Sequence, residues 1–157
     1  MTDTSSPYDR LRSLGIALPP ERLPVANFVS ETRDGGLMFL SGQGPQEVNG
    51  TYHTGKVGGT VTAAQAYQHA RLTGINLIGV MHHALGDLSR VRQILKVFGM
   101  VNASPEFFDH PFVINGCSDL FVAVFGNAGK HARSAVGLGS LPFGITVEIE
   151  AIVSIHA

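Results

Sequence analysis

The chain has 157 residues, of which 44% are hydrophobic and 15% are charged, with one cysteine and a formal net charge of −1 at pH 7. A chain of this length folds as one domain with a core of its own, and a single cysteine excludes an intrachain disulfide. Because the charges balance and no run of five like charges occurs, the sequence lacks the basic footprint of a nucleic-acid-binding protein.

The low charged fraction is typical of a subunit that buries surface against other copies of itself, and the alternative is a hydrophobic monomer. The N-terminus lacks the basic start and the apolar run of a secretory signal. No apolar stretch approaches the roughly 18 residues that a membrane helix needs. We therefore expect a cytoplasmic protein that makes no use of a membrane.

The first 26 residues are predicted to form an appendage, and residues 27–157 are predicted to form the main domain. Ser6 and Pro7 are typical of the N-cap and first position of a short helix, and Gly15 is typical of the residue that ends one. Three prolines then exclude regular structure as far as about residue 27. They are Pro19, Pro20 and Pro24.

A β-hairpin is predicted next, with strands over 28–32 and 37–41 that flank Asp34 and Gly35. The glycine-rich segment 42–59 is expected to be a loop with one short strand near Tyr52. A long amphipathic helix follows, because apolar residues recur at steps of three and four up to Leu85. Thr60 or Thr62 would cap this helix.

The second half of the chain alternates between strand and helix. The pattern predicts a strand over Val91–Asn102, a short turn over Ser104–Phe108 and a second helix over about Phe112–Phe125. Two strands close the chain, and in the last one apolar residues alternate with other residues from Ile145 to Ile155. This order predicts an α+β fold in which two helices cover one face of a mixed sheet.

Three features could carry chemistry. Arg133, at the start of a strand, offers a planar fork of donors that suits a carboxylate or a phosphate, although a surface arginine is the alternative. Glu148 and Glu150 share one face of the last strand, so they could handle a proton or form an ion pair, and one of them lies beside Arg133 if the two final strands pair. Ser41 and Gly42 end a strand where the backbone can approach a ligand closely.

Metal and thiol chemistry are not predicted. His82 and His83 are neighbours that face different directions on a helix, and the sequence contains no cysteine–histidine cluster and no phosphate-loop motif. Cys117 lies on the apolar stripe of the second helix, so we expect a small buried hydrophobe rather than a nucleophile.

Several motifs occur in order between about residues 27 and 157, and together they define a resemblance. The motifs are Leu40-Ser41-Gly42-Gln43, His131-Ala132-Arg133-Ser134, Leu141-Pro142 and Val147-Glu148-Ile149-Glu150-Ala151, with Asn76 and Asn115. With these residues the chain resembles the Rid family, the YjgF-type reactive intermediate deaminases that are also called endoribonuclease L-PSP-like. The resemblance implies a chorismate-mutase-like fold and a homotrimer with clefts between neighbouring subunits.

The resemblance also implies an activity, the hydrolysis of 2-imino or 2-enamino acids to 2-keto acids and ammonia, as in 2-iminobutanoate/2-iminopropanoate deaminases. Arg133 would fix the carboxylate of this small-molecule partner, Glu148 would be the cleft glutamate, and Gly42 would be a backbone contact. No metal or organic cofactor is expected. The other expected substrate-binding positions are Phe28, Ser41, Asn115 and Ala135.

Three residues depart from the family pattern. Phe28 stands where many members carry tyrosine, Ala135 where they often carry cysteine, and His131 where proline is usual. Phe28 lacks the hydroxyl that could bond substrate or water. Two alternative functions therefore stay open: a non-catalytic trimer that binds a small metabolite or another protein, and an endoribonuclease, which the charge balance disfavours.

Overall fold

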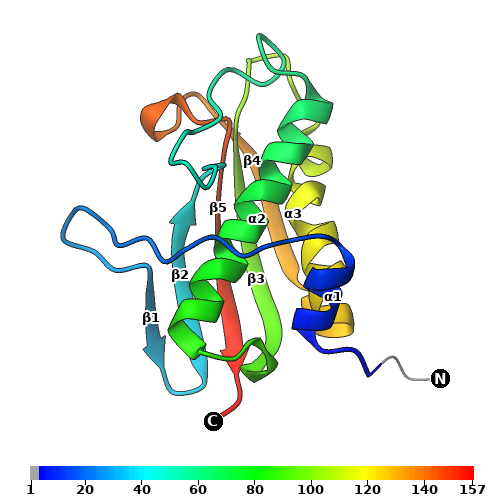
Figure 1. Ribbon diagram of the computed structural model, residues 1–157. Coiled ribbons are helices and arrows are strands. Elements are labelled where there is room, and N and C mark those ends of the chain that lie inside the picture. The colour runs from blue at the N-terminus through cyan, green and yellow to red at the C-terminus, as the bar shows by residue number, and fades with distance from the viewer. Residues whose placement is uncertain (1–3) are drawn as a thin grey trace.

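Five strands form one mixed sheet in the computed structural model, which describes residues 4–157 (Figure 1). The strand order is β1-β2-β5-β3-β4, and only the β3–β4 pair is parallel. The prediction of a mixed sheet is confirmed. The strands are β1 (Glu31–Asp34), β2 (Leu37–Gln43), β3 (Val91–Asn102), β4 (Ala132–Leu138) and β5 (Val147–Ile155).

Two long helices, α2 (Ala63–Leu85) and α3 (His110–Phe125), lie side by side on one face of this sheet (Figure 1). α2 begins at a capping box between Thr62 and Gln65 and ends at Gly86, as its sequence predicts. The short 3-10 turns η1 (Leu88–Arg90), η2 (Gly126–Gly129) and η3 (Pro142–Gly144) connect elements.

The N-terminal segment is fastened to the helix layer. Helix α1 (Pro7–Ser13) starts at a capping box between Ser6 and Asp9 and packs against α3. The proline-rich segment that follows crosses over α2 (Figure 1), where His83 Nε2 donates a hydrogen bond to the Pro19 carbonyl at 2.9 Å. Residues 1–3 of the predicted appendage lie outside the described residues.

The main core fills the space between the helices and the sheet. Alternate residues of the central strands point into it, among them Val97 of β3 and Ile149 of β5. A smaller cluster of Met100, Leu141 and Ile145 lies outside the main core. Within the described residues no helix covers this second face of the sheet (Figure 1), and Phe39 and Val136 on it are exposed.

The two final strands do not pair, so the expected approach of a glutamate to Arg133 along neighbouring strands is wrong. β3 lies between β4 and β5, because α3 returns the chain from β3 to a parallel β4 at the sheet edge. Smaller differences concern element ends. β1 begins at Glu31 rather than residue 28, and α3 begins at His110 because Pro111 suits a first helical turn.

One expectation about apolar stretches also needs correction. The segment His110–Gly129 is long and apolar enough to span a membrane by composition, although we expected no such stretch. Half of it is buried inside the protein, where α3 packs on α2 and on β3. The segment is therefore buried as a core helix is, against α2 and the sheet.

Candidate active site

Arg133 lies on the edge strand β4 and faces the helix layer. Its register partner is the core residue Val97, so the two side chains leave the sheet on the same side. Arg133 Nη1 donates hydrogen bonds to Asn115 Oδ1 at 2.8 Å and to Ser118 Oγ at 3.2 Å, both on α3. Both acceptors are uncharged, and the ion pairs found among residues 4–157 do not include Arg133. The guanidinium is therefore positioned but not neutralised.

His131 orients the Ser118 hydroxyl. The Gly129 carbonyl lies 2.7 Å from His131 Nδ1 and can only accept, which assigns the ring proton to Nδ1 and leaves Nε2 as an acceptor. Ser118 Oγ, 2.9 Å from Nε2, therefore donates its hydrogen to His131 and turns a lone pair toward Arg133. Burial lowers the pKa of His131, against the opposing effect of the bond to Gly129, and favours the neutral ring that this chain of bonds requires.

Glu148 lies on the other face of the sheet, where it packs against the backbone of Gly42. A Cβ atom added at residue 42 would lie 3.0 Å from the Glu148 carboxyl carbon, so glycine at this position lets the carboxyl group lie close against β2. Burial raises the pKa of Glu148, and the nearby charge of Glu150 raises it further. The carboxyl group is thus a better proton acceptor than an exposed glutamate.

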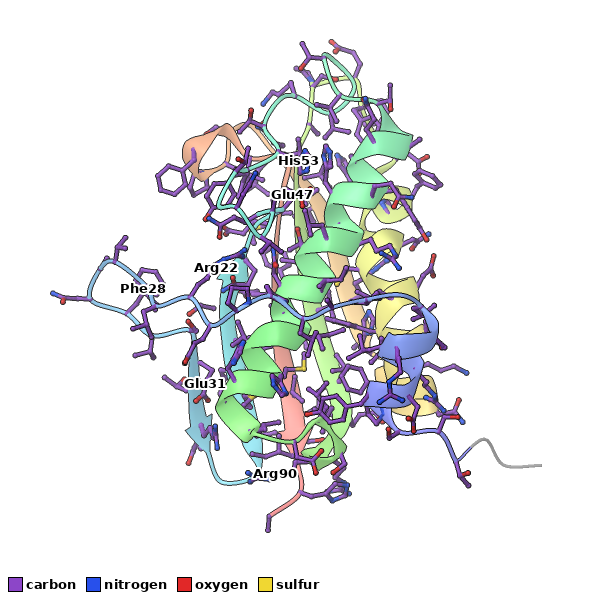
Figure 2. All side chains as sticks on the ribbon, viewed as in Figure 1. Arg22, Phe28, Glu31, Glu47, His53 and Arg90 are labelled. Carbon is purple, nitrogen blue, oxygen red and sulfur yellow. The ribbon has the colours of Figure 1, made fainter. Side chains whose placement is uncertain are left out.

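A β-bulge presents Gly42 to Glu148. In the β2–β5 ladder Leu40 pairs with Ala151 and Gln43 pairs with Ile149, so Ser41 and Gly42 together oppose one residue of β5. Ser41 Oγ donates to the Val29 carbonyl at 2.6 Å, and Ser41 N donates to the Ser30 carbonyl at 3.0 Å. Ser41 therefore holds in place the segment that carries Phe28 (Figure 2). Phe28 is 57% exposed.

Buried Asn76 of α2 fixes the loop that follows Gly42. Its Nδ2 donates to the carbonyls of Gly44 and Gln46, each at 3.0 Å, and Arg22 Nη2 donates to the Glu47 carbonyl at 2.7 Å. Figure 2 shows Glu47 and His53 on this loop and Arg22 on the N-terminal segment beside it.

Sequence reasoning missed a histidine pair formed between this loop, which carries His53, and helix α2, which carries His69. The rings of His53 and His69 stack with centroids 4.3 Å apart, His53 Nε2 lies 2.8 Å from Glu47 Oε1, and His69 Nδ1 lies 3.0 Å from Thr146 Oγ1. Burial lowers the pKa of His69 to about 4, and the neighbouring His53 lowers it as well. His53 and His69 are far apart in the sequence, so no local pattern predicts the contact between their rings.

The expected site residues fall into two groups. Arg133, Asn115 and Ala135 lie on the helix-covered side of β4, since Ala135 packs against the main core two residues after Arg133. Gly42 and Glu148 lie on the opposite face, and the segment of Phe28 is tied to the same end of β2 through Ser41. One chain alone does not bring the two groups together.

Cys117 is fully buried on α3, as predicted, and burial raises the pKa of its thiol far above the usual range. A thiol in this state is a poor nucleophile. No group of three or more histidine, cysteine, aspartate or glutamate side chains suited to a metal ion occurs in the part of the chain that the structure describes.

Comparison with known proteins finds a family model and several relatives that match this chain. Residues 8–147 match the family model described as "YjgF/chorismate mutase-like, putative endoribonuclease". Protein TCP17 of Trypanosoma cruzi is 41% identical over 147 residues, which cover 93% of this chain and 92% of that protein. The crystal structure of Atu1372 from Agrobacterium tumefaciens, a protein of unknown function, has a TM-score of 0.87 at 44% identity, with 94% of this chain and 92% of that chain covered. A Shewanella oneidensis structure with the same endoribonuclease description has a TM-score of 0.92 at 28% identity, with 96% and 100% covered.

Proposed function

The chain belongs to the YjgF/chorismate-mutase-like (Rid) family and has its α+β fold, and from that premise we propose that it hydrolyses reactive 2-imino or 2-enamino acids to 2-keto acids and ammonia. One observation carries this proposal. Two uncharged acceptors hold Arg133, and none of the ion pairs found within residues 4–157 supplies it with a carboxylate. A guanidinium fork in this state is preorganised for the carboxylate of a ligand.

The reaction needs orientation more than covalent help. With the substrate carboxylate on Arg133, water adds to the imine carbon to give a carbinolamine. The carbinolamine then expels ammonia as the carbon–oxygen double bond forms. Glu148 is suited to accept a proton from the attacking water and to return it to the departing nitrogen, because burial raises its pKa. Fixing an already reactive imine beside an oriented water contributes several kcal/mol without an intermediate bound to the protein.

The proposed site is shared between subunits of a homotrimer. Arg133 and Glu148 leave opposite faces of the sheet, so a second copy must supply one of them to any common substrate. The face that carries Glu148 lacks a helix cover within the described residues and exposes Phe39 and Val136. Apolar surface of this kind and the 15% charged fraction both suit burial against a neighbour.

The experiment generates 2-iminobutanoate and 2-iminopropanoate with an amino-acid oxidase and follows ammonia and keto-acid release with and without the protein. Acceleration over the spontaneous rate is expected, from a species that scatters light as about three times the 16.7 kDa chain. A folded trimer that leaves the rate unchanged would refute catalysis. A monomer at micromolar concentration would refute the shared site.

One residue favours a second candidate, a trimer that binds a small carboxylate without turning it over. Phe28 has no hydroxyl to orient water, whereas Arg133 can clamp a ligand without any such group. Keto-acid binding without imine hydrolysis would select this candidate.

The endoribonuclease is not proposed for this chain. His53 and His69 could serve as an acid–base pair, but their rings stack 4.3 Å apart, which leaves no room for a phosphodiester between them.

A further inference from the structure

Phe143, in η3, has a strained backbone conformation and an exposed aromatic ring. With φ 59° and ψ 11° it is the one residue other than glycine with a positive φ among residues 4–157, and its side chain is 84% exposed. A left-handed backbone is unfavourable for a bulky residue, and such strain persists where the surroundings impose it, often at functional sites. Two backbone hydrogen bonds hold Phe143 in this left-handed conformation. Gly144 N donates to the Leu141 carbonyl at 3.0 Å, and Gly55 N donates to the Gly144 carbonyl at 2.9 Å.

A second ring accompanies Phe143. Tyr52, on the loop between β2 and α2, stacks on it with ring centroids 6.1 Å apart and an interplanar angle of 18°. The Tyr52 loop is itself held by hydrogen bonds from Glu47 N to the Thr51 carbonyl at 2.8 Å and from His53 N to the Pro45 carbonyl at 3.1 Å. Two loops that are hydrogen-bonded to each other therefore present nearly parallel aromatic faces at the end of the sheet where β5 begins.

The aromatic pair lies next to the carboxyl group of the proposed site. Glu148 packs on Gly42, and two residues further along the same segment Tyr52 and Ile145 pack on Gly44. A Cβ atom at residue 44 would lie 2.9 Å from Ile145 Cδ1 and 3.3 Å from Tyr52 Cε1. Residues two apart in an extended chain are separated by roughly 7 Å. The ring centre of an aromatic amino-acid derivative lies about 4 Å from its reacting carbon, so a substrate ring that extends toward Gly44 comes within the roughly 4.5–7 Å at which aromatic rings stack.

We propose that Tyr52 and Phe143 form the side-chain subsite of the deaminase, and that they select 2-imino acids with aromatic side chains over those with small aliphatic ones. The inference rests on the proposed function, because the subsite serves a substrate whose carboxylate Arg133 holds. A planar substrate ring completes a stack with the two fixed rings, whereas the methyl or ethyl group of a small imino acid contacts neither fully. Ring stacking of this kind strengthens binding by about threefold to tenfold for each ring.

The test measures the dissociation constants of phenylpyruvate and 2-oxobutanoate by calorimetry, and the relative rates on the corresponding imines. Phe143→Asn removes the ring at a position where asparagine tolerates the left-handed backbone, so loss of folding does not confuse the result. Tyr52→Ala removes the second ring and Tyr52→Phe keeps it. Phe108→Asn is the matched control, because Phe108 is similarly exposed at 79% but lies in the turn before α3.

Wild type is expected to prefer phenylpyruvate, and Phe143→Asn and Tyr52→Ala are expected to lower this preference by about fivefold. Tyr52→Phe and Phe108→Asn should leave the preference unchanged. An unchanged preference in folded, trimeric Phe143→Asn overturns the subsite, as does dissociation of that variant to monomers without a change of preference. Arg133→Ala separates the two proposals, because it should weaken both keto acids equally if the deaminase site is correct.

Discussion

Ser118 Oγ accepts a hydrogen bond from Arg133 Nη1 at 3.2 Å and can do so because its own hydrogen is directed to His131 Nε2, 2.9 Å away. His131 thereby acts on Arg133 without touching it. The histidine that departs from the family pattern is a positioning residue in this account, because both of its ring nitrogens are engaged within the chain.

Ser118→Ala removes one of the two acceptors that hold Arg133 Nη1, so the clamp should loosen. We expect about tenfold weaker binding of 2-oxobutanoate, the usual size of the loss when a charged group loses a hydrogen bond. Calorimetric titration measures it. His131→Gln should retain more affinity than His131→Phe, because an amide oxygen can still accept from Ser118. Equal affinities for wild type, Ser118→Ala and His131→Phe would show that the relay does not position Arg133.

Gly42→Ala places a methyl group 3.0 Å from the Glu148 carboxyl carbon, which must then move. We expect kcat/KM on 2-iminobutanoate to fall by on the order of tenfold to a hundredfold, since small displacements of a catalytic group have effects of this size. Gly36→Ala is the matched control, because its added methyl group would meet only the Ile155 carbonyl oxygen at 3.7 Å. Wild-type kinetics in folded Gly42→Ala would remove Glu148 from the mechanism.

The half-buried His69 makes stability depend on pH. Burial lowers its pKa to about 4 in the folded protein from a usual value of 6.5, so the unfolded chain takes up the proton first as the pH falls. The contribution of His69 to the free energy of unfolding is complete above pH 6.5 and is lost as the pH falls toward 4. Urea unfolding between pH 7.5 and 4.5 should show a smaller decrease for His69→Gln than for wild type. Identical decreases would mean that His69 titrates normally.

Local rules predicted the parts of the fold that depend on neighbours in sequence. The Thr62 cap, the stop at Gly86 and both ends of β3 follow from capping chemistry and apolar periodicity. The same rules did not place β3 between the last two strands, because strand order is decided by how α3 packs across the sheet. Pairing β4 with β5 would have put Arg133 and Glu148 in one chain's site.

The residues of the candidate site likewise divide into those that the sequence suggested and those that only the structure revealed. Residue type suggested Arg133 and the pair Glu148 and Glu150 as candidates, and the family resemblance then singled out Arg133 and Glu148. Ser118 gives no such signal, because a serine on a helix is ordinary until its two partners are seen. The stacking of His53 on His69 likewise arises because a loop packs against α2. The sequence spacing of the two histidines does not predict that contact.

The most direct test of the central claim titrates wild type, Arg133→Lys and Arg133→Ala with 2-oxobutanoate and pyruvate, with the mass of each variant checked by light scattering. Lysine keeps the charge but loses the planar fork, so a clamp should fail in both variants, each binding on the order of 30-fold or more weakly than wild type. A simple counter-ion would tolerate lysine. If trimeric Arg133→Ala binds keto acids as tightly as wild type, Arg133 is not the carboxylate clamp and the proposed mechanism is wrong.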